Sequence, residues 1–213
     1  MDDPLRFCDA LLRCACCLTR IARQAAVSDE VPVLSVGALS KRWLVPGWRC
    51  GWLLVHDRGR ALASAGVVEA LSRLVQISIG PTVPVQASVP HLLANTPREW
   101  HAAQCAGYAA AAALCAERAA ACPGLALDAL PRGAMYLLIR VQLACFDASV
   151  GADDVAFAGA LQREEAVLLL PGAAFGAPGR LRLVLCAPLE TLHAAWDRIG
   201  AFAARHYVGN GKG

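Results

Sequence analysis

Short apolar runs and helical spacings of apolar residues alternate along the first half of this chain. Residues 31–36 and residues 52–56 are almost continuously apolar, which is typical of buried strands. Residues 61–77 carry apolar side chains at every third and fourth position, which predicts a helix. A Gly-Pro pair breaks that spacing, and Thr82 is then suited to cap a further helix over residues 83–93.

A long alanine-rich segment follows and predicts one extended helix. Thr96 is suited to the N-cap, Pro97 to the first turn, and Glu99 stands three residues after Thr96, as a capping box requires. Alanine dominates until about residue 121, where a Cys-Pro-Gly sequence ends the helix. A helix of this length is able to connect two lobes of a protein.

The remaining residues predict a unit of mixed strands and helices. Strands are expected over residues 133–141, 166–170 and 180–186, and helices over residues 153–162 and 188–207. In the last helix, one face carries the large apolar residues Leu192, Trp196, Ile199 and Phe202. In the last strand, Arg180 and Arg182 share one face because side chains alternate along a strand.

Composition excludes several classes of function. The 213 residues are 57% hydrophobic with a net charge of +3, too small a charge to suggest nucleic acid as a partner. No apolar run reaches the roughly 18–20 residues that span a bilayer, so no membrane partner is expected. Ten cysteines without paired C-x-x-C spacing, and five scattered histidines, predict free thiols, no metal site and a cytoplasmic location.

The loop between the first two predicted strands carries the strongest chemical signal. Lys41 stands near its start, and Arg49 follows eight residues later. A lysine against an apolar wall loses its proton more easily, and the neutral amine attacks a carbonyl carbon to form a Schiff base. An arginine binds a phosphate through two parallel hydrogen bonds. A carbonyl compound that also carries a phosphate describes pyridoxal 5'-phosphate, whereas the alternative for both residues is an ordinary solvated surface charge.

The sequence of this loop, S-K-R-W-L-V-P-G-W-R-C-G-W, resembles the lysine motif of class I aminotransferases with the type I pyridoxal-phosphate fold, and in detail that of tyrosine aminotransferases. The resemblance implies that Lys41 holds pyridoxal 5'-phosphate and acts as the catalytic acid and base, and that Arg49 binds the phosphate. Two positions depart from the motif: Ala38 lacks a phosphate-binding hydroxyl, and Cys50 replaces an aliphatic residue.

A second segment, P-G-A-A-F-G-A-P-G-R-L-R, also resembles this family, in which a strand after the P-G-x-x-F turn carries the arginine that binds the substrate carboxylate. The resemblance assigns that role to Arg182 and leaves Arg180 at a variable position. The alternative for either arginine is an exposed strand residue paired with an acid. Tyr136, in the family-like segment R-G-A-M-Y, is expected to pack rather than to react.

The family also has an aspartate that pairs with the pyridine nitrogen, followed three residues later by a tyrosine. Asp9 lies 32 residues before Lys41, at about the family distance, but Leu12 occupies the tyrosine position. Asp9 is therefore a candidate for this role, against the alternative of a surface aspartate.

The resemblance implies an α/β fold corresponding to the C-terminal half of such an enzyme. Residues 1–95 are expected to be a remnant of the large cofactor domain, residues 96–122 the connecting helix, and residues 123–213 the small α+β domain. The implied function is transamination of an amino acid, tyrosine-like and aromatic, to a 2-oxo acid, in a chain whose full-length relatives form homodimers. The alternatives are a non-catalytic fragment or interaction module, and a pyridoxal-phosphate lyase of the same fold.

Overall fold

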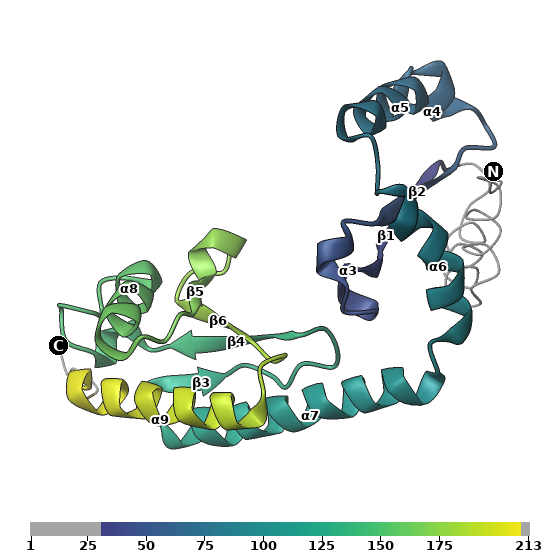
Figure 1. Ribbon diagram of the computed structural model, residues 1–213. Helices are drawn as coiled ribbons and strands as arrows, with labels where there is room; N and C mark the ends of the chain where they lie inside the picture. Colours follow the sequence, from purple (N-terminus) through teal and green to yellow (C-terminus); the bar gives the residue numbers. More distant parts are fainter. Residues whose placement is uncertain (1–30, 210–213) are drawn as a thin grey trace. The chain divides into compact units, whose positions relative to one another are not determined.

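The computed structural model describes residues 31–209 of a chain that divides into two compact units, residues 1–101 and 102–213 (Figure 1). Each unit has its own strands and its own buried cluster. The long helix α7 (Arg98–Ala121) begins at the end of the first unit and provides the first helix of the second.

The first unit contains a β-hairpin that confirms both predicted strands but not their predicted burial, because no residue of either strand is buried. Strand β1 (Val33–Ala38) pairs antiparallel with β2 (Gly51–His56), with Val33 opposite His56 and Ala38 opposite Gly51. The connection consists of the short helix α3 (Leu39–Arg42) and the single 3₁₀ turn η1 (Pro46–Trp48).

The helix predicted over residues 61–77 is two helices, α4 (Ala61–Ser64) and α5 (Val67–Ser78). They are separated at Gly66, whose φ of +74° lies in the left-handed region that glycine adopts without steric cost. Helix α6 (Val83–Asn95) follows Thr82 as predicted, although the Thr82 side chain makes no capping hydrogen bond.

The predicted capping box at Thr96 is wrong. Helix α7 begins at Arg98, and the Thr96 hydroxyl donates backwards to the Leu92 carbonyl oxygen at 2.6 Å. The Thr96 backbone N–H donates to the same oxygen. Thr96 therefore closes the end of α6, because a free carbonyl of the preceding helix lies within its reach.

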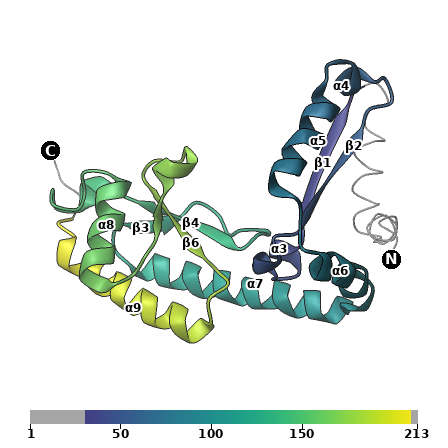
Figure 2. The ribbon, with the colours of Figure 1, turned by 45° about the horizontal axis from the view of Figure 1, so that its top comes forward.

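The second unit is a four-stranded antiparallel sheet covered on one face by helices (Figure 2). The strand order is β3 (Leu125–Leu127), β4 (Tyr136–Val141), β6 (Arg180–Val184) and β5 (Leu170–Pro171). Helices α8 (Asp154–Glu165) and α9 (Leu189–His206) join α7 over the buried face, and the turns η2 (Leu143–Cys145) and η3 (Gly172–Phe175) complete the unit. The apolar face of α9 is buried as predicted.

All three strands predicted for this unit are shorter than expected, and β6 ends at Val184 rather than at residue 186. Only Leu170 and Pro171 of the fifth strand pair with β6, although Val167 and Leu169 are buried. Strand β4 starts at Tyr136, after Ala134 adopts a left-handed φ of 65°. Alternating apolar residues thus identified the buried face. Hydrogen bonding to the neighbouring strand decided where each strand begins and ends.

Candidate functional site

Lys41 lies in the last turn of α3, on the loop that joins β1 to β2. The loop is closed at its base, where the Leu39 backbone N–H donates to the Cys50 carbonyl oxygen at 3.1 Å. Leu39 is fully buried, whereas the Lys41 side chain is exposed. The described residues therefore hold the Lys41 backbone firmly and leave its amine accessible.

Trp43 anchors the middle of the same loop. It is buried with Leu39, Cys50 and Val89 in the core cluster of the first unit. The His101 ring meets the Trp43 ring edge to face at a centroid distance of 5.8 Å. Burial, with a smaller contribution from the nearby Arg42 charge, lowers the pKa of His101, so a neutral imidazole is favoured against this tryptophan.

Arg49 ends the loop in a left-handed backbone conformation, with φ of 48°. Its Nη1 donates to the Pro46 carbonyl oxygen at 3.0 Å, and the rest of the exposed guanidinium remains available. A lysine amine and an arginine guanidinium on one loop fit the two reactive ends of pyridoxal phosphate, because an amine condenses with its aldehyde and a guanidinium binds its phosphate.

Arg182 belongs to the second unit, on the face of the sheet opposite the helices. Along β6 the core-facing Leu181 and Leu183 are buried, and Arg180 and Arg182 are only half-buried. The prediction that the two arginines share a face is therefore confirmed.

Their surroundings differ sharply. Arg180 donates through Nε and Nη2 to one carboxylate oxygen of Asp128, at 3.0 and 2.9 Å. Arg140, directly opposite Arg180 on β4, pairs with the other oxygen of Asp128 at 3.1 Å. The surface ion pair weighed as an alternative thus applies to Arg180.

The Arg182 guanidinium instead lies over aromatic rings. Its Cζ is 3.9 Å from the ring centroid of Phe175 and 4.5 Å from that of Tyr136. Its Nε is buried without a hydrogen-bond partner, and no carboxylate within residues 31–209 pairs with its side chain. Arg182 consequently retains a positive charge that an anion can neutralise.

The site residues predicted from the sequence fall into three groups. Lys41 and Arg49 lie on one hydrogen-bonded loop of the first unit, and Arg182 lies on the sheet of the second unit. Asp9 lies outside the described residues. The two rings at Arg182 were missed as site residues, although Phe175 was part of the P-G-x-x-F turn and so offered a signal.

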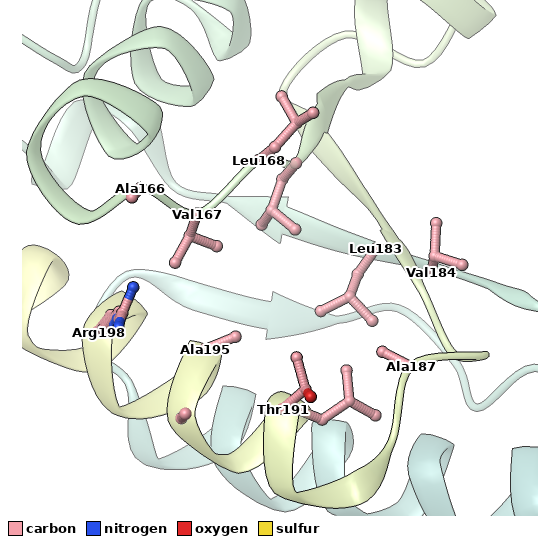
Figure 3. Close-up of a pocket in the computed structure, with 12 residues that line it drawn as sticks. Ala166, Val167, Leu168, Leu183, Val184, Ala187, Thr191, Ala195 and Arg198 are labelled. Atoms are coloured by element: carbon pink, nitrogen blue, oxygen red, sulfur yellow. The ribbon is translucent and has the colours of Figure 1, made fainter.

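The structure also contains an apolar pocket of about 360 Å³ in the second unit, between α9 and the segment leading into β5 (Figure 3). Leu168, Leu183, Val184 and Ala195 line it, with Arg198 as its charged residue. Arg198 donates to the Glu165 carbonyl oxygen at 3.2 Å. None of the predicted site residues lines this pocket, so it is separate from the candidate chemistry.

Residues 31–209 contain no group of three or more histidine, cysteine or acidic residues arranged to hold a metal ion. In the same part of the chain, no helix combines the length and apolar character that crossing a membrane requires.

Comparison with known proteins places these features in a family. Residues 15–199 match the family model of class I and II aminotransferases. The tyrosine aminotransferase of Homo sapiens is 38% identical over 183 residues, and that of Dictyostelium discoideum is 36% identical over 185 residues. These alignments cover 86% and 85% of this chain, but only 39% and 44% of the two relatives.

Solved structures agree with the sequence match. Tyrosine aminotransferase from Leishmania infantum superposes with a TM-score of 0.75 at 29% identity, covering 84% of this chain and 42% of that one. Alanine aminotransferase from Pyrococcus furiosus gives 0.73 at 26% identity, with 85% and 44% coverage. The predicted fold, part of a type I pyridoxal-phosphate aminotransferase, is confirmed, and the chain spans about two fifths of the length of these relatives. The chain belongs to the class I and II aminotransferases.

Proposed function

We propose that this chain is part of a pyridoxal-phosphate-dependent aminotransferase that transfers the amino group of a tyrosine-like, aromatic amino acid to a 2-oxo acid. The observation that carries the proposal is the closed loop from Leu39 to Cys50, which presents an accessible amine and an accessible guanidinium. The aromatic preference is supported by the tyrosine aminotransferases among the relatives. The whole activity belongs to a protein of which this chain represents a part.

Lys41 has two tasks in this function. Its Nζ would hold the cofactor covalently. As a free amine, the same atom would accept the α-proton of the substrate and then donate it again. When bound, pyridoxal phosphate supplies an aldehyde that condenses with amino groups and a ring that withdraws electrons from the α-carbon. Hydrogen bonding at the base of the loop holds the backbone segment from which the amine extends.

The two arginines bind rather than react. Arg49 supplies donors for the cofactor phosphate, and Arg182 supplies a planar pair of donors for the substrate carboxylate. A homodimer and a cytoplasmic location accompany the proposal. The homodimer is supported by family membership. The location is supported by the free thiols of Cys50, Cys105, Cys115, Cys122 and Cys186.

Borohydride trapping tests the role of Lys41 without requiring turnover. The chain contains two lysines, Lys41 and Lys212, so a reduced adduct is assigned directly by peptide mass spectrometry. After incubation with pyridoxal phosphate and reduction, we expect the adduct on Lys41, absent from Lys41→Ala and retained in the matched control Lys212→Ala. Equal labelling of both lysines would contradict the assignment.

The phosphate contact is tested by comparing pyridoxal phosphate with pyridoxal. Arg49→Gln removes a charge-assisted contact, so we expect half-maximal labelling of Lys41 to need about tenfold more pyridoxal phosphate. Labelling by pyridoxal, which lacks the phosphate, should be the same in Arg49→Gln and the unaltered chain. A parallel loss with both compounds would mean that Arg49 supports the loop and does not bind the phosphate.

A second candidate function, a non-catalytic interaction module, is favoured by the exposed apolar side chains on one face of the β1–β2 hairpin. Leu34, Val36, Leu53 and Val55 share that face and are all exposed, with Val36 at 79%. A two-stranded sheet has only edge strands, and an apolar sheet with open edges tends to associate with other chains. This function predicts no adduct on Lys41, together with concentration-dependent association in sedimentation velocity that Val36→Lys abolishes.

A further inference from the structure

We propose that Tyr136 and Phe175 are positioning residues, which hold the Arg182 guanidinium on their rings and orient it toward a carboxylate ligand. The proposal rests on the function proposed for Arg182 and extends it to two residues that contact the arginine and not the reacting atoms.

The geometry is that of an arginine held by ring faces. Cζ of Arg182 lies 3.9 Å from the Phe175 centroid and 4.5 Å from the Tyr136 centroid, both within the range of cation–π attraction. A planar guanidinium stacks well on such rings and keeps its N–H donors free, because a ring face accepts no ordinary hydrogen bond. The rings thus restrict the side chain without consuming its donors.

The charge pattern on this face explains why rings are used. Arg180 and Arg140 share the carboxylate of Asp128, which holds both side chains and offsets their charge. A similar acid beside Arg182 would compete with any anionic ligand for the same donors. Aromatic rings orient the guanidinium and leave its charge in place, as a carboxylate-binding arginine requires.

The buried Nε of Arg182 indicates which donors remain for the ligand. This atom is covered by protein and has no hydrogen-bond partner in the described part of the chain. The terminal Nη groups are absent from the buried atoms that lack a partner. We infer that a carboxylate meets the two Nη groups side by side, since that edge offers two parallel donors.

Phe175 lies at the end of a turn that a hydrogen bond to a buried carboxylate holds in place. It ends η3, and the Ala173 backbone N–H in that turn donates to Asp154 Oδ2 at 2.7 Å. Asp154 is a charged side chain only 2% exposed, at the start of α8. Phe175 itself remains 48% exposed, so its ring contributes little to the core and its place beside Arg182 is not explained by burial.

Nuclear magnetic resonance of the arginine Nε–Hε groups tests the positioning role in the intact chain. Arg182→Lys identifies the Arg182 signal, which we expect to be displaced upfield by the two ring currents. Phe175→Leu and Tyr136→Leu should each move the signal toward that of a free arginine. The ring-retaining variants Phe175→Tyr and Tyr136→Phe should keep it displaced, and Arg180→Lys serves as a control on the same strand.

Titration with 3-phenylpropanoate, a simple carboxylate with an apolar group, tests the ligand role separately. We expect it to shift the Arg182 signal, and loss of either ring to raise the dissociation constant about two- to fivefold. An unchanged signal in both leucine variants would overturn the positioning role. A ring-shifted Arg182 that 3-phenylpropanoate does not perturb would overturn the proposed carboxylate role and leave the positioning geometry standing.

Discussion

At the scale of single residues, two arginines that are two positions apart on β6 make different interactions, because the residues around them differ. Arg180 is paired with Asp128, whereas Arg182 lies on aromatic rings and pairs with no carboxylate of the described residues. Strand periodicity places both on one face, and only the neighbouring strand and turn distinguish them.

His206 is a further residue whose protonation depends on its neighbours. Its Nδ1 lies 2.7 Å from Asp147 Oδ2, and its Nε2 lies 3.0 Å from Glu164 Oε2. Arg205 also pairs with Glu164 and with Glu165 on α8. The hydrogen bonds to Glu164 and Asp147 raise the pKa of His206 against the opposing effect of burial. The charged imidazole thereby ties the end of α9 to α8 and to the segment after η2.

This arrangement predicts a pH dependence of stability. Because the pKa of His206 is raised on folding, its contribution is complete below the ordinary value of 6.5 and is lost as pH rises through the folded-state pKa. A neutral imidazole donates only one hydrogen bond, so one of the two acids loses its hydrogen bond from the ring. We expect urea unfolding of the second unit to show decreasing stability from pH 6.5 to pH 8.5.

His206→Gln is the matched variant, since its amide keeps a hydrogen-bonding group but does not titrate. Its unfolding free energy should be lower at pH 6 and nearly flat over this interval. The same decrease with pH in His206→Gln would assign the effect to another group. Asp147 and Glu164 have lowered pKa values, through hydrogen bonds to Ser149 and His206 respectively, so their contribution disappears only at more acidic pH.

At the scale of elements, the turn η3 shows how a short segment controls a site. Gly172 starts this turn and is buried, and the Ala177 backbone N–H donates to its carbonyl oxygen at 2.9 Å. An added Cβ at Gly172 would lie 2.1 Å from the Ala177 carbonyl oxygen and 2.9 Å from that of Arg180. Both neighbours are backbone atoms, which cannot move without displacing the turn and the start of β6.

Gly172→Ala is therefore expected to destabilise the second unit by about 1–3 kcal/mol through overpacking. It should also shift the Arg182 Nε–Hε signal, because the displaced turn carries Phe175. Gly176→Ala provides a comparison in the same turn, where an added Cβ meets no atom but the φ of 70° is unfavourable for alanine. A smaller loss in Gly172→Ala than in Gly176→Ala, measured by urea unfolding, would contradict this account.

At the scale of the whole molecule, the two units differ in how much core they contain. Among the described residues of the second unit, twenty-five buried residues form its cluster, including Trp196, Phe157 and Phe202. The described residues of the first unit contribute a cluster of four. Helix α5 has no buried residue, and Leu74, Val75 and Ile77 are exposed along it. Apolar burial is the main favourable contribution to stability, so the second unit should be the more stable.

Hydrogen exchange on the intact chain measures this difference directly. We expect amides of β4, β6 and the buried part of α9 to exchange slowest, and those of β1, β2 and α5 to exchange at least tenfold faster. Equal protection in the two units would indicate that the first unit gains burial from contacts beyond those within residues 31–209.

Much of the fold could be predicted from local patterns. The apolar runs located β1 and β2, and the spacing of Leu192, Trp196 and Ile199 identified the buried face of α9. The break at Gly66 and the new role of Thr96 were missed. The break depends on the backbone conformation of Gly66, and the role of Thr96 depends on a nearby free carbonyl. Neither feature alters the period of the apolar pattern.

The roles of Lys41, Arg49 and Arg182 were inferred from motifs. For these residues the structure adds which other residues they contact and how exposed they are. The sequence by itself determined the family, the order of most elements and which side chains share a face, because these follow from local periodicity and from the wording of two motifs. Only the tertiary structure decided that Asp128 offsets Arg180, that Phe175 and Tyr136 lie beside Arg182, and that His206 meets acids 59 and 42 residues away. Such pairings join residues distant in sequence, and no local pattern encodes the distance between two charges.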